Sequence, residues 1–123
     1  MKLLQRQEVE VYYVIPSLRR HLAVEMKNLN FKQKEIAHLL NIEEAAISQY
    51  LNGKRGNKIE FSDGVVSEIR KSAGLITDKL SLLREIQRLM RVVVESCEIC
   101  KIHKEVCDVP GECEPKLINC FGR

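Results

Sequence analysis

The segment from Phe31 to Gly56, FKQKEIAHLLNIEEAAISQYLNGKRG, decides the fold of this chain. Apolar residues recur at helical spacing in each half of it, which predicts two short amphipathic helices joined by a tight turn. The first half carries Ile36, Ala37 and Leu40, and the second half carries Ile47, Tyr50 and Leu51.

Asn41 lies between the two predicted helices. Asparagine is one of the few residues other than glycine that tolerates a left-handed backbone, so we expect Asn41 to end the first helix and turn the chain. Ala37 is small at a point where two helices must cross closely. The segment therefore predicts a helix-turn-helix unit.

Polar residues occupy the remaining face of the second predicted helix, and Ser and Gln side chains can hydrogen-bond base edges in the major groove of DNA. The turn NGKRG follows, with two cations where a phosphate backbone would pass. We therefore predict that the unit binds double-stranded DNA; an ordinary helical hairpin with a polar outer face is the alternative. The predicted DNA-binding residues are Gln33 on the first helix, Glu44, Ala45, Ala46, Ser48 and Gln49 on the second, and Lys54, Arg55 and Lys58 for phosphates.

The runs QKEIAHLLNI and AAISQYLNGKRG resemble the Cro/CI-type (XRE) helix-turn-helix regulators, over residues 16–75. The second run is similar to small archaeal regulators of this class that carry a cysteine-bearing tail. The chain departs from the family at Asn41, where glycine is usual. The resemblance implies a bundle of about five helices and a role in transcription regulation.

Charge is distributed unevenly along the 123 residues. Residues 1–60 carry ten Lys and Arg against seven Asp and Glu, whereas residues 91–123 carry five against six. The basic surplus thus coincides with the predicted helix-turn-helix, as phosphate neutralisation requires. The sequence shows neither a signal peptide nor a membrane-spanning stretch, so we expect a cytoplasmic protein.

The flanking segments predict an all-α fold. Residues 9–15 are compatible with a short strand or the tail of a helix, and Pro16 favours a break before a helix over 18–28. Ser62 or Asp63 can cap a helix over 64–73, and Thr77 or Asp78 can cap a longer one over 79–96. We divide the chain into a DNA-binding domain (1–76), a long helix (77–96) and a cysteine-rich module (97–123).

The long predicted helix has a wide apolar face. One stripe can pack on the DNA-binding domain, and the other can meet a second copy of the chain. Because one recognition helix reads few base pairs, we expect a homodimer; a single buried helix is the alternative. The two stripes are Leu82, Ile86, Leu89 and Val93, and Leu80, Leu83, Met90 and Val94.

Five cysteines occupy the last 27 residues in the pattern C-x2-C-x6-C-x5-C-x6-C. In a reducing cytosol such a cluster favours metal binding or redox sensing over structural disulfides. An iron–sulfur cluster, of the 4Fe–4S type, accepts these irregular gaps better than zinc does. Zinc, with His103 as a substitute ligand, and a metal-free thiol switch are the alternatives. The predicted ligands are Cys97, Cys100, Cys107 and Cys113, with the role of Cys120 open.

The combined hypothesis is a DNA-binding regulator whose tail senses iron, oxygen or redox state. A partner-docking protein that does not bind DNA is the alternative from another class. The sequence contains no glycine-rich phosphate loop, nucleophile–base set or paired carboxylates, so we do not predict an enzyme. We expect His21 and His38 to be surface residues.

Overall fold

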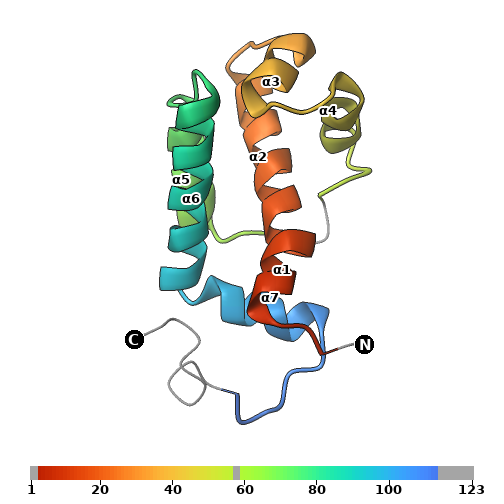
Figure 1. Cartoon of the computed structure of the whole chain (residues 1–123), viewed down its shortest axis with the longest axis vertical. Coiled ribbons are helices and arrows are strands. Elements are labelled where there is room, and N and C mark those ends of the chain that lie inside the picture. The colour runs from red at the N-terminus through yellow and green to blue at the C-terminus, as the bar shows by residue number, and fades with distance from the viewer. Residues whose placement is uncertain (1–2, 57–58, 114–123) are drawn as a thin grey trace.

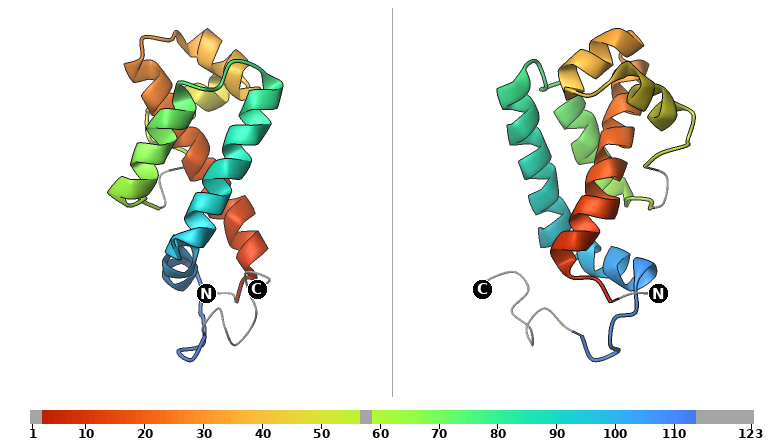
Figure 2. Two further views of the ribbon diagram at one scale, coloured as in Figure 1. Left: turned by 90° about the vertical axis from the view of Figure 1, so that its left-hand side faces the viewer. Right: turned by 45° about the vertical axis from the view of Figure 1, so that its right-hand side comes forward.

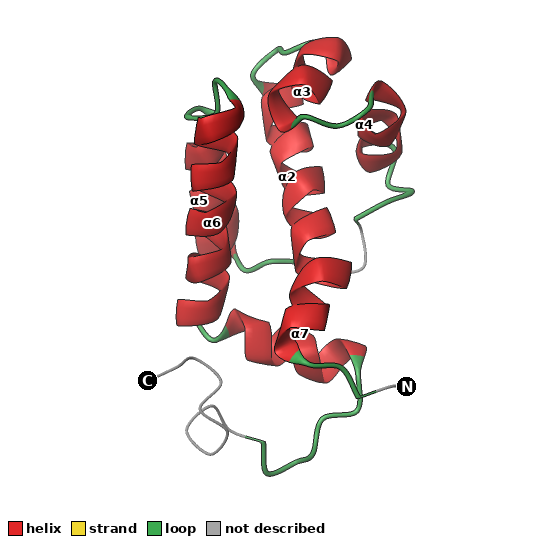
Figure 3. Cartoon of the chain, in the orientation of Figure 1, coloured by secondary structure: helices red, strands yellow, loops and turns green. Residues whose placement is uncertain are grey.

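The computed structural model describes residues 3–56 and 59–113, and every regular element within these ranges is a helix (Figures 1 and 3). This confirms the prediction of an all-α fold. None of these helices is both long enough and apolar enough to cross a membrane. The elements are α1 (Arg6–Val9), a π-helical turn (Glu10–Val14), α2 (Ile15–Asn28), α3 (Gln33–Leu40), α4 (Glu44–Leu51), α5 (Asp63–Ala73), α6 (Lys79–Glu95) and α7 (Glu98–Val106).

The central element is α2, which contacts α3, α4, α5 and α6. Figures 1 and 2 show α5 and α6 along one side of α2, with α3 and α4 toward its C-terminal end. At the opposite end α7 packs against α1 and α6. The fully buried side chains include Leu18, Leu22, Met26, Ile36, Ile47, Ile69, Leu89, Ile99 and Ile102.

All three segments into which we divided the sequence contribute to one apolar core. Ile36 comes from the first segment, Leu89 from the second and Ile99 from the third. Burial of a large aliphatic side chain contributes about 1.5–3 kcal/mol. The described part of the cysteine segment therefore shares one apolar core with the other two segments.

The N-terminal segment is helical without a break from Arg6 to Asn28, so the alternative of a strand over residues 9–15 is wrong. The break expected at Pro16 is also absent from this stretch. Proline lacks an N–H and clashes with the carbonyl four residues earlier, which here belongs to Tyr12. Tyr12 lies in the π-helical turn, and a wider turn accommodates such a mismatch inside a helix.

The ends of the helices follow the predicted signals. Asn41 adopts the left-handed conformation (φ 55°, ψ 43°) that ends α3. The Ser62 hydroxyl accepts a hydrogen bond from the Val65 N–H (3.4 Å) at the start of α5. The Asp78 carboxylate accepts one from the Ser81 N–H (2.8 Å) at the start of α6, and this bond lowers the pKa of Asp78.

Several leucines of the predicted helices are exposed. Leu29 (53% exposed) and Leu75 (52%) follow the last turns of α2 and α5, where the chain leaves the packed helix. Leu80 (71%) and Leu83 (64%) lie on the outer side of α6, whereas Met90 in the same predicted stripe is buried. The wide apolar face of the long helix is thus only partly used within the chain.

Candidate nucleic-acid interface

Helix α4 presents two different faces. Ile47 and Tyr50 are buried in the core, and their burial fixes the rotation of the helix about its axis. Ala45, Ser48 and Gln49 are exposed, and their spacing of three and four residues places them on one outward side. This side has no bulky apolar residue, so a flat polar surface such as a base-pair edge can approach it closely.

The predicted DNA-facing residues on α3 and α4 differ in exposure. Glu44, at the first position of α4, is exposed, whereas Ala46 is half-buried because it lies beside Ile47 on the inner flank. Gln33, at the first position of α3, is half-buried. Both α3 and α4 thus begin with a predicted DNA-facing residue.

The turn between α3 and α4 holds the two helices in contact. The N–H of Ile42 donates to the carbonyl of Ala37 (3.0 Å), closing the left-handed turn at Asn41. Ala37 itself is buried, as expected for a small residue at a close helix crossing.

The basic loop after α4 is ordered by backbone contacts. The N–H of Lys54 donates to the carbonyl of Gln49 (2.9 Å) and to the side-chain oxygen of Asn52 (3.2 Å). The guanidinium carbon of Arg55 lies 5.8 Å from the centre of the Tyr50 ring. Lys54 and Arg55 are exposed, so both cations are available to a phosphate backbone; the predicted contact Lys58 lies outside the described residues.

The four predicted cysteine ligands occupy different environments. Cys97 is exposed in a left-handed conformation (φ 61°) between α6 and α7, Cys100 and Cys113 are half-buried, and Cys107 is buried with its thiol donating to the carbonyl of His103 (3.3 Å). Within residues 3–56 and 59–113, no three His, Cys, Asp or Glu side chains gather closely enough to hold a metal ion. The described residues therefore do not form the predicted cluster site, and Cys120 lies outside them.

Helix α7 lies within the cysteine-rich module, for which we predict no helix from the sequence. Ile99, Ile102 and Val106, which are three and four residues apart, were the signal for an amphipathic helix. The helix is tied to the rest of the chain by two polar contacts. The Glu98 carboxylate accepts hydrogen bonds from the Ser62 N–H (2.7 Å) and hydroxyl (2.8 Å), and Nε2 of His103 lies 2.6 Å from the carbonyl oxygen of Leu4.

His21 is half-buried rather than a surface residue, and its ring packs against Phe61 with the centroids 5.3 Å apart. Burial lowers its pKa, and the neighbouring Arg20 lowers it further, so the ring is neutral at pH 7. His38 is exposed on α3, as expected.

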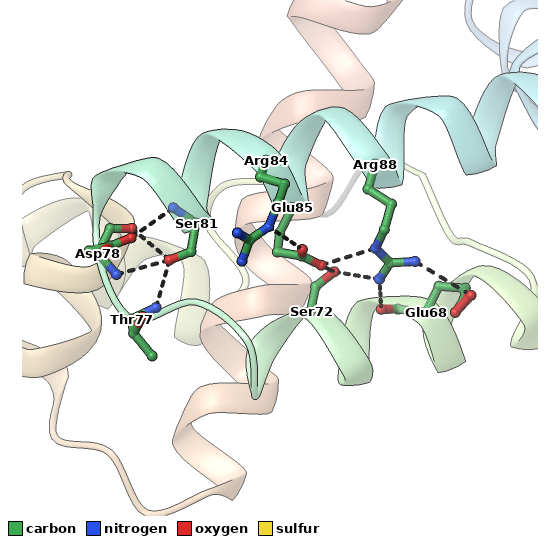
Figure 4. Close-up of polar contacts among 8 residues, drawn as sticks. All are labelled: Glu68, Ser72, Thr77, Asp78, Ser81, Arg84, Glu85 and Arg88. Atoms are coloured by element: carbon green, nitrogen blue, oxygen red, sulfur yellow. Dashed lines mark hydrogen bonds and ion pairs between the residues drawn. The ribbon is translucent and has the colours of Figure 1, made fainter.

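A buried carboxylate joins α5 to α6 (Figure 4). Glu85 is 3% exposed and accepts hydrogen bonds from the Ser72 hydroxyl (2.8 Å), Nε of Arg88 (3.0 Å) and Nε of Arg84 (3.3 Å). Burial by itself would raise the pKa of Glu85, but these three donors together hold it below its ordinary value. Arg88 also donates to the carbonyl of Glu68 (3.1 Å), so the network fixes the long helix against α5.

Comparison of this chain with protein-family models, with curated proteins and with solved structures gives no match.

Proposed function

We propose that this protein is a sequence-specific regulator of transcription that binds double-stranded DNA with α4 in the major groove. The observation that carries the proposal is the division of α4 into a buried apolar face and an exposed face of small and polar residues, followed directly by an ordered basic loop. An α-helix with its side chains is about 10–12 Å across, so α4 fits the major groove, which is about 12 Å wide. The resemblance of this segment to Cro/CI-type regulators points the same way.

The proposal assigns different roles to the helix and the loop. Ser48 and Gln49 face base edges and select sequence, whereas Lys54 and Arg55 contact phosphates and supply affinity that does not depend on sequence. Gln33 and Glu44, at the starts of α3 and α4, border the same surface.

Selection of bound duplexes from a random library, followed by affinity measurements at several salt concentrations, tests these roles. Gln49→Ala should relax the preference at one base pair, at a cost of about 1–3 kcal/mol for the selected sequence. Arg55→Ala should weaken binding to every sequence and lower the salt slope by about 1. Lys101→Ala, at an exposed position on α7, is the matched control and should change neither quantity.

Two results would contradict the proposal. If Gln49→Ala and Arg55→Ala lowered the affinity for every DNA sequence equally, α4 and the basic loop would not have the separate roles proposed for them. A wild-type chain whose duplex affinity is negligible even at low salt would favour the partner-docking protein instead, because a DNA binder has its highest affinity at low salt, where the release of counterions from DNA is most favourable.

The regulator is proposed to act as a homodimer that spans two half-sites. The surface for this contact is the outer side of α6, where Leu80 and Leu83 are exposed, next to Leu75 in the preceding turn. Because these side chains are exposed, Leu80→Glu and Leu83→Glu should convert a dimer to a monomer in sedimentation equilibrium without unfolding it. A wild-type monomer at the concentrations that saturate DNA would refute this part of the proposal.

The cysteine segment is proposed to modulate DNA binding in response to redox or metal status. The support is the packing of α7, which carries Cys100 and contacts α1 and α6. Its Glu98 side chain is also hydrogen-bonded to Ser62 at the start of α5. A chemical change at the cysteines therefore acts on helices that pack around α2. If the affinity of Cys97→Ala for DNA equals that of the wild type under both oxidising and reducing conditions, the sensing role is wrong.

The iron–sulfur cluster stays a prediction, with zinc as its alternative, and no step of this mechanism depends on it. An absorption spectrum with iron, sulfide and zinc assays on anaerobically purified protein decides between them. Brown protein with matched iron and sulfide supports the cluster. One zinc per chain supports a structural zinc site, and metal-free protein supports the thiol switch.

A further inference from the structure

A groove of about 370 Å³ lies between the N-terminal helical segment and the basic loop. All three tyrosines of the chain line it, namely Tyr12, Tyr13 and Tyr50, together with the cations Arg19, Lys54 and Arg55. Among residues 3–56 and 59–113, no acidic side chain lines the groove. The groove thus combines phenol groups and positive charges from segments about 40 residues apart in sequence.

The two walls of the groove are fixed against each other. Gly56 ends the basic loop with φ 71°, and its Cα lies so close to α2 that an added Cβ would be 2.6 Å from the carbonyl oxygen of Pro16 and 2.9 Å from the Cβ of Arg20. Tyr50 is 3% exposed, which anchors the wall next to α4. The backbone segments that carry the cations of the loop and of α2 therefore keep a set separation.

We propose that this groove binds the phosphate backbone of double-stranded DNA beyond the base pairs that α4 faces. Arg, Lys and Tyr side chains are all donors to phosphate oxygens in protein–DNA complexes. The groove is open and continues directly from the loop that already carries Lys54 and Arg55, which suits a passing strand better than an enclosed small molecule. The inference rests on the proposed function and adds Arg19 and the hydroxyls of Tyr12 and Tyr13 to the interface.

Salt-dependent binding of a mixed-sequence duplex to the full chain tests the contact at Arg19. Loss of one phosphate contact lowers the slope of log affinity against log salt by about 0.9. Arg19→Gln should show this decrease, and Tyr12→Phe, which removes only a hydroxyl at an exposed position, should weaken binding at low salt. Arg91→Gln, at an exposed position on α6, is the matched control and should keep the wild-type slope.

Because Tyr12 and Tyr13 line the groove and lie outside α4, the fluorine NMR signals of these two residues in protein labelled with fluorotyrosine report on this site. Duplex DNA should shift these signals, and a millimolar nucleoside monophosphate should not. Strong shifts with the mononucleotide and none with duplex would overturn the proposal in favour of a free nucleotide. If Arg19→Gln kept the wild-type slope of log affinity against log salt, the proposed groove contact would be wrong and the role of α4 would be unaffected. If the wild type did not bind duplex DNA at all, the proposed function itself would be refuted.

Discussion

The carboxylate of Glu98 accepts two hydrogen bonds from Ser62, one from its backbone N–H (2.7 Å) and one from its hydroxyl (2.8 Å). Ser62 is also the residue that caps α5, since its hydroxyl oxygen faces the N–H of Val65. One side chain of the cysteine-bearing helix thus completes the first turn of a helix that packs on α2. This contact is a direct polar link between the cysteine segment and the proposed DNA-binding domain.

Replacing this carboxylate should destabilise the fold. Glu98 is 8% exposed, and hydrogen bonds to a charged group contribute about 1.5–3 kcal/mol. We expect Glu98→Ala to lower the free energy of unfolding in urea by about that amount. Glu105→Ala, at an exposed position of the same helix, is the control and should change it by less than about 0.5 kcal/mol. Equal effects of the two substitutions would show that the contact with Ser62 contributes nothing.

The sequence predicted the parts of the fold that depend on local signals. Periodicity located α3 and α4, and capping residues located the starts of α5 and α6, because both signals act within one or two turns. The contact between Glu98 and Ser62 joins residues 36 apart in sequence and depends on how α7 packs, which no local pattern encodes. The groove also depends on tertiary packing, since Tyr12 and Arg55 line it together only after α2 and α4 have packed.

The π-helical turn and α7 are the two elements that depart from the local signals. Pro16 is usually a stop signal, and the wider turn before it accommodates the proline within a continuous helix. In α7, Ile99 and Ile102 are both almost fully buried, and their helical spacing lies within a segment whose cysteines have a metal-ligand pattern.

The stability of the fold should fall in acid partly through Glu85. The pKa of its carboxyl is lower in the folded chain than in the unfolded chain, where it is about 4.3. The charged form therefore stabilises the fold above the unfolded pKa, and this contribution is lost as the pH falls through the folded pKa. We expect the free energy of unfolding of the wild type to decrease below about pH 5, and Glu85→Gln to show a shallower decrease over the same range.

Urea titrations at several pH values measure this difference. Glu105→Gln, at an exposed position on α7, should retain the wild-type pH dependence. A Glu85→Gln variant that is as sensitive to acid as the wild type would show that other carboxylates, such as Asp78, account for the loss.

Asn41 should tolerate glycine and reject alanine. Its φ of 55° is left-handed, which costs a residue with a Cβ and no local hydrogen-bonding group about 1–2 kcal/mol. We expect Asn41→Ala to lower the free energy of unfolding by about 1 kcal/mol, and Asn41→Gly to preserve it. Asn28→Ala, within the last turn of α2, is the control for loss of an asparagine side chain at a right-handed position. Equal values for the alanine and glycine variants at position 41 would show that the left-handed turn does not limit stability.

The thiols should differ in reactivity according to their burial. Cys97 is exposed, whereas Cys107 is 2% exposed and donates to the carbonyl of His103. In reduced, metal-free protein, we expect iodoacetamide to modify Cys97 first and Cys107 only on the timescale of unfolding. Mass spectrometry of timed samples gives the rate at each site. Equal rates in native buffer and in urea for Cys107 would place its thiol outside the core.

The two glycines of the basic loop offer a matched test of how the loop is seated on α2. Gly53 (φ 78°) and Gly56 (φ 71°) are both left-handed, so alanine strains the backbone equally at each, by about 1–2 kcal/mol. An added Cβ at Gly53 meets no atom within 4 Å, whereas at Gly56 it would collide with the Pro16 carbonyl. We therefore expect Gly56→Ala to cost more stability than Gly53→Ala and, by displacing Lys54 and Arg55 from the groove, to weaken duplex binding further. Urea unfolding and duplex affinity measured on the same two samples separate the effects, and equal losses in both assays would show that the close contact with Pro16 is dispensable.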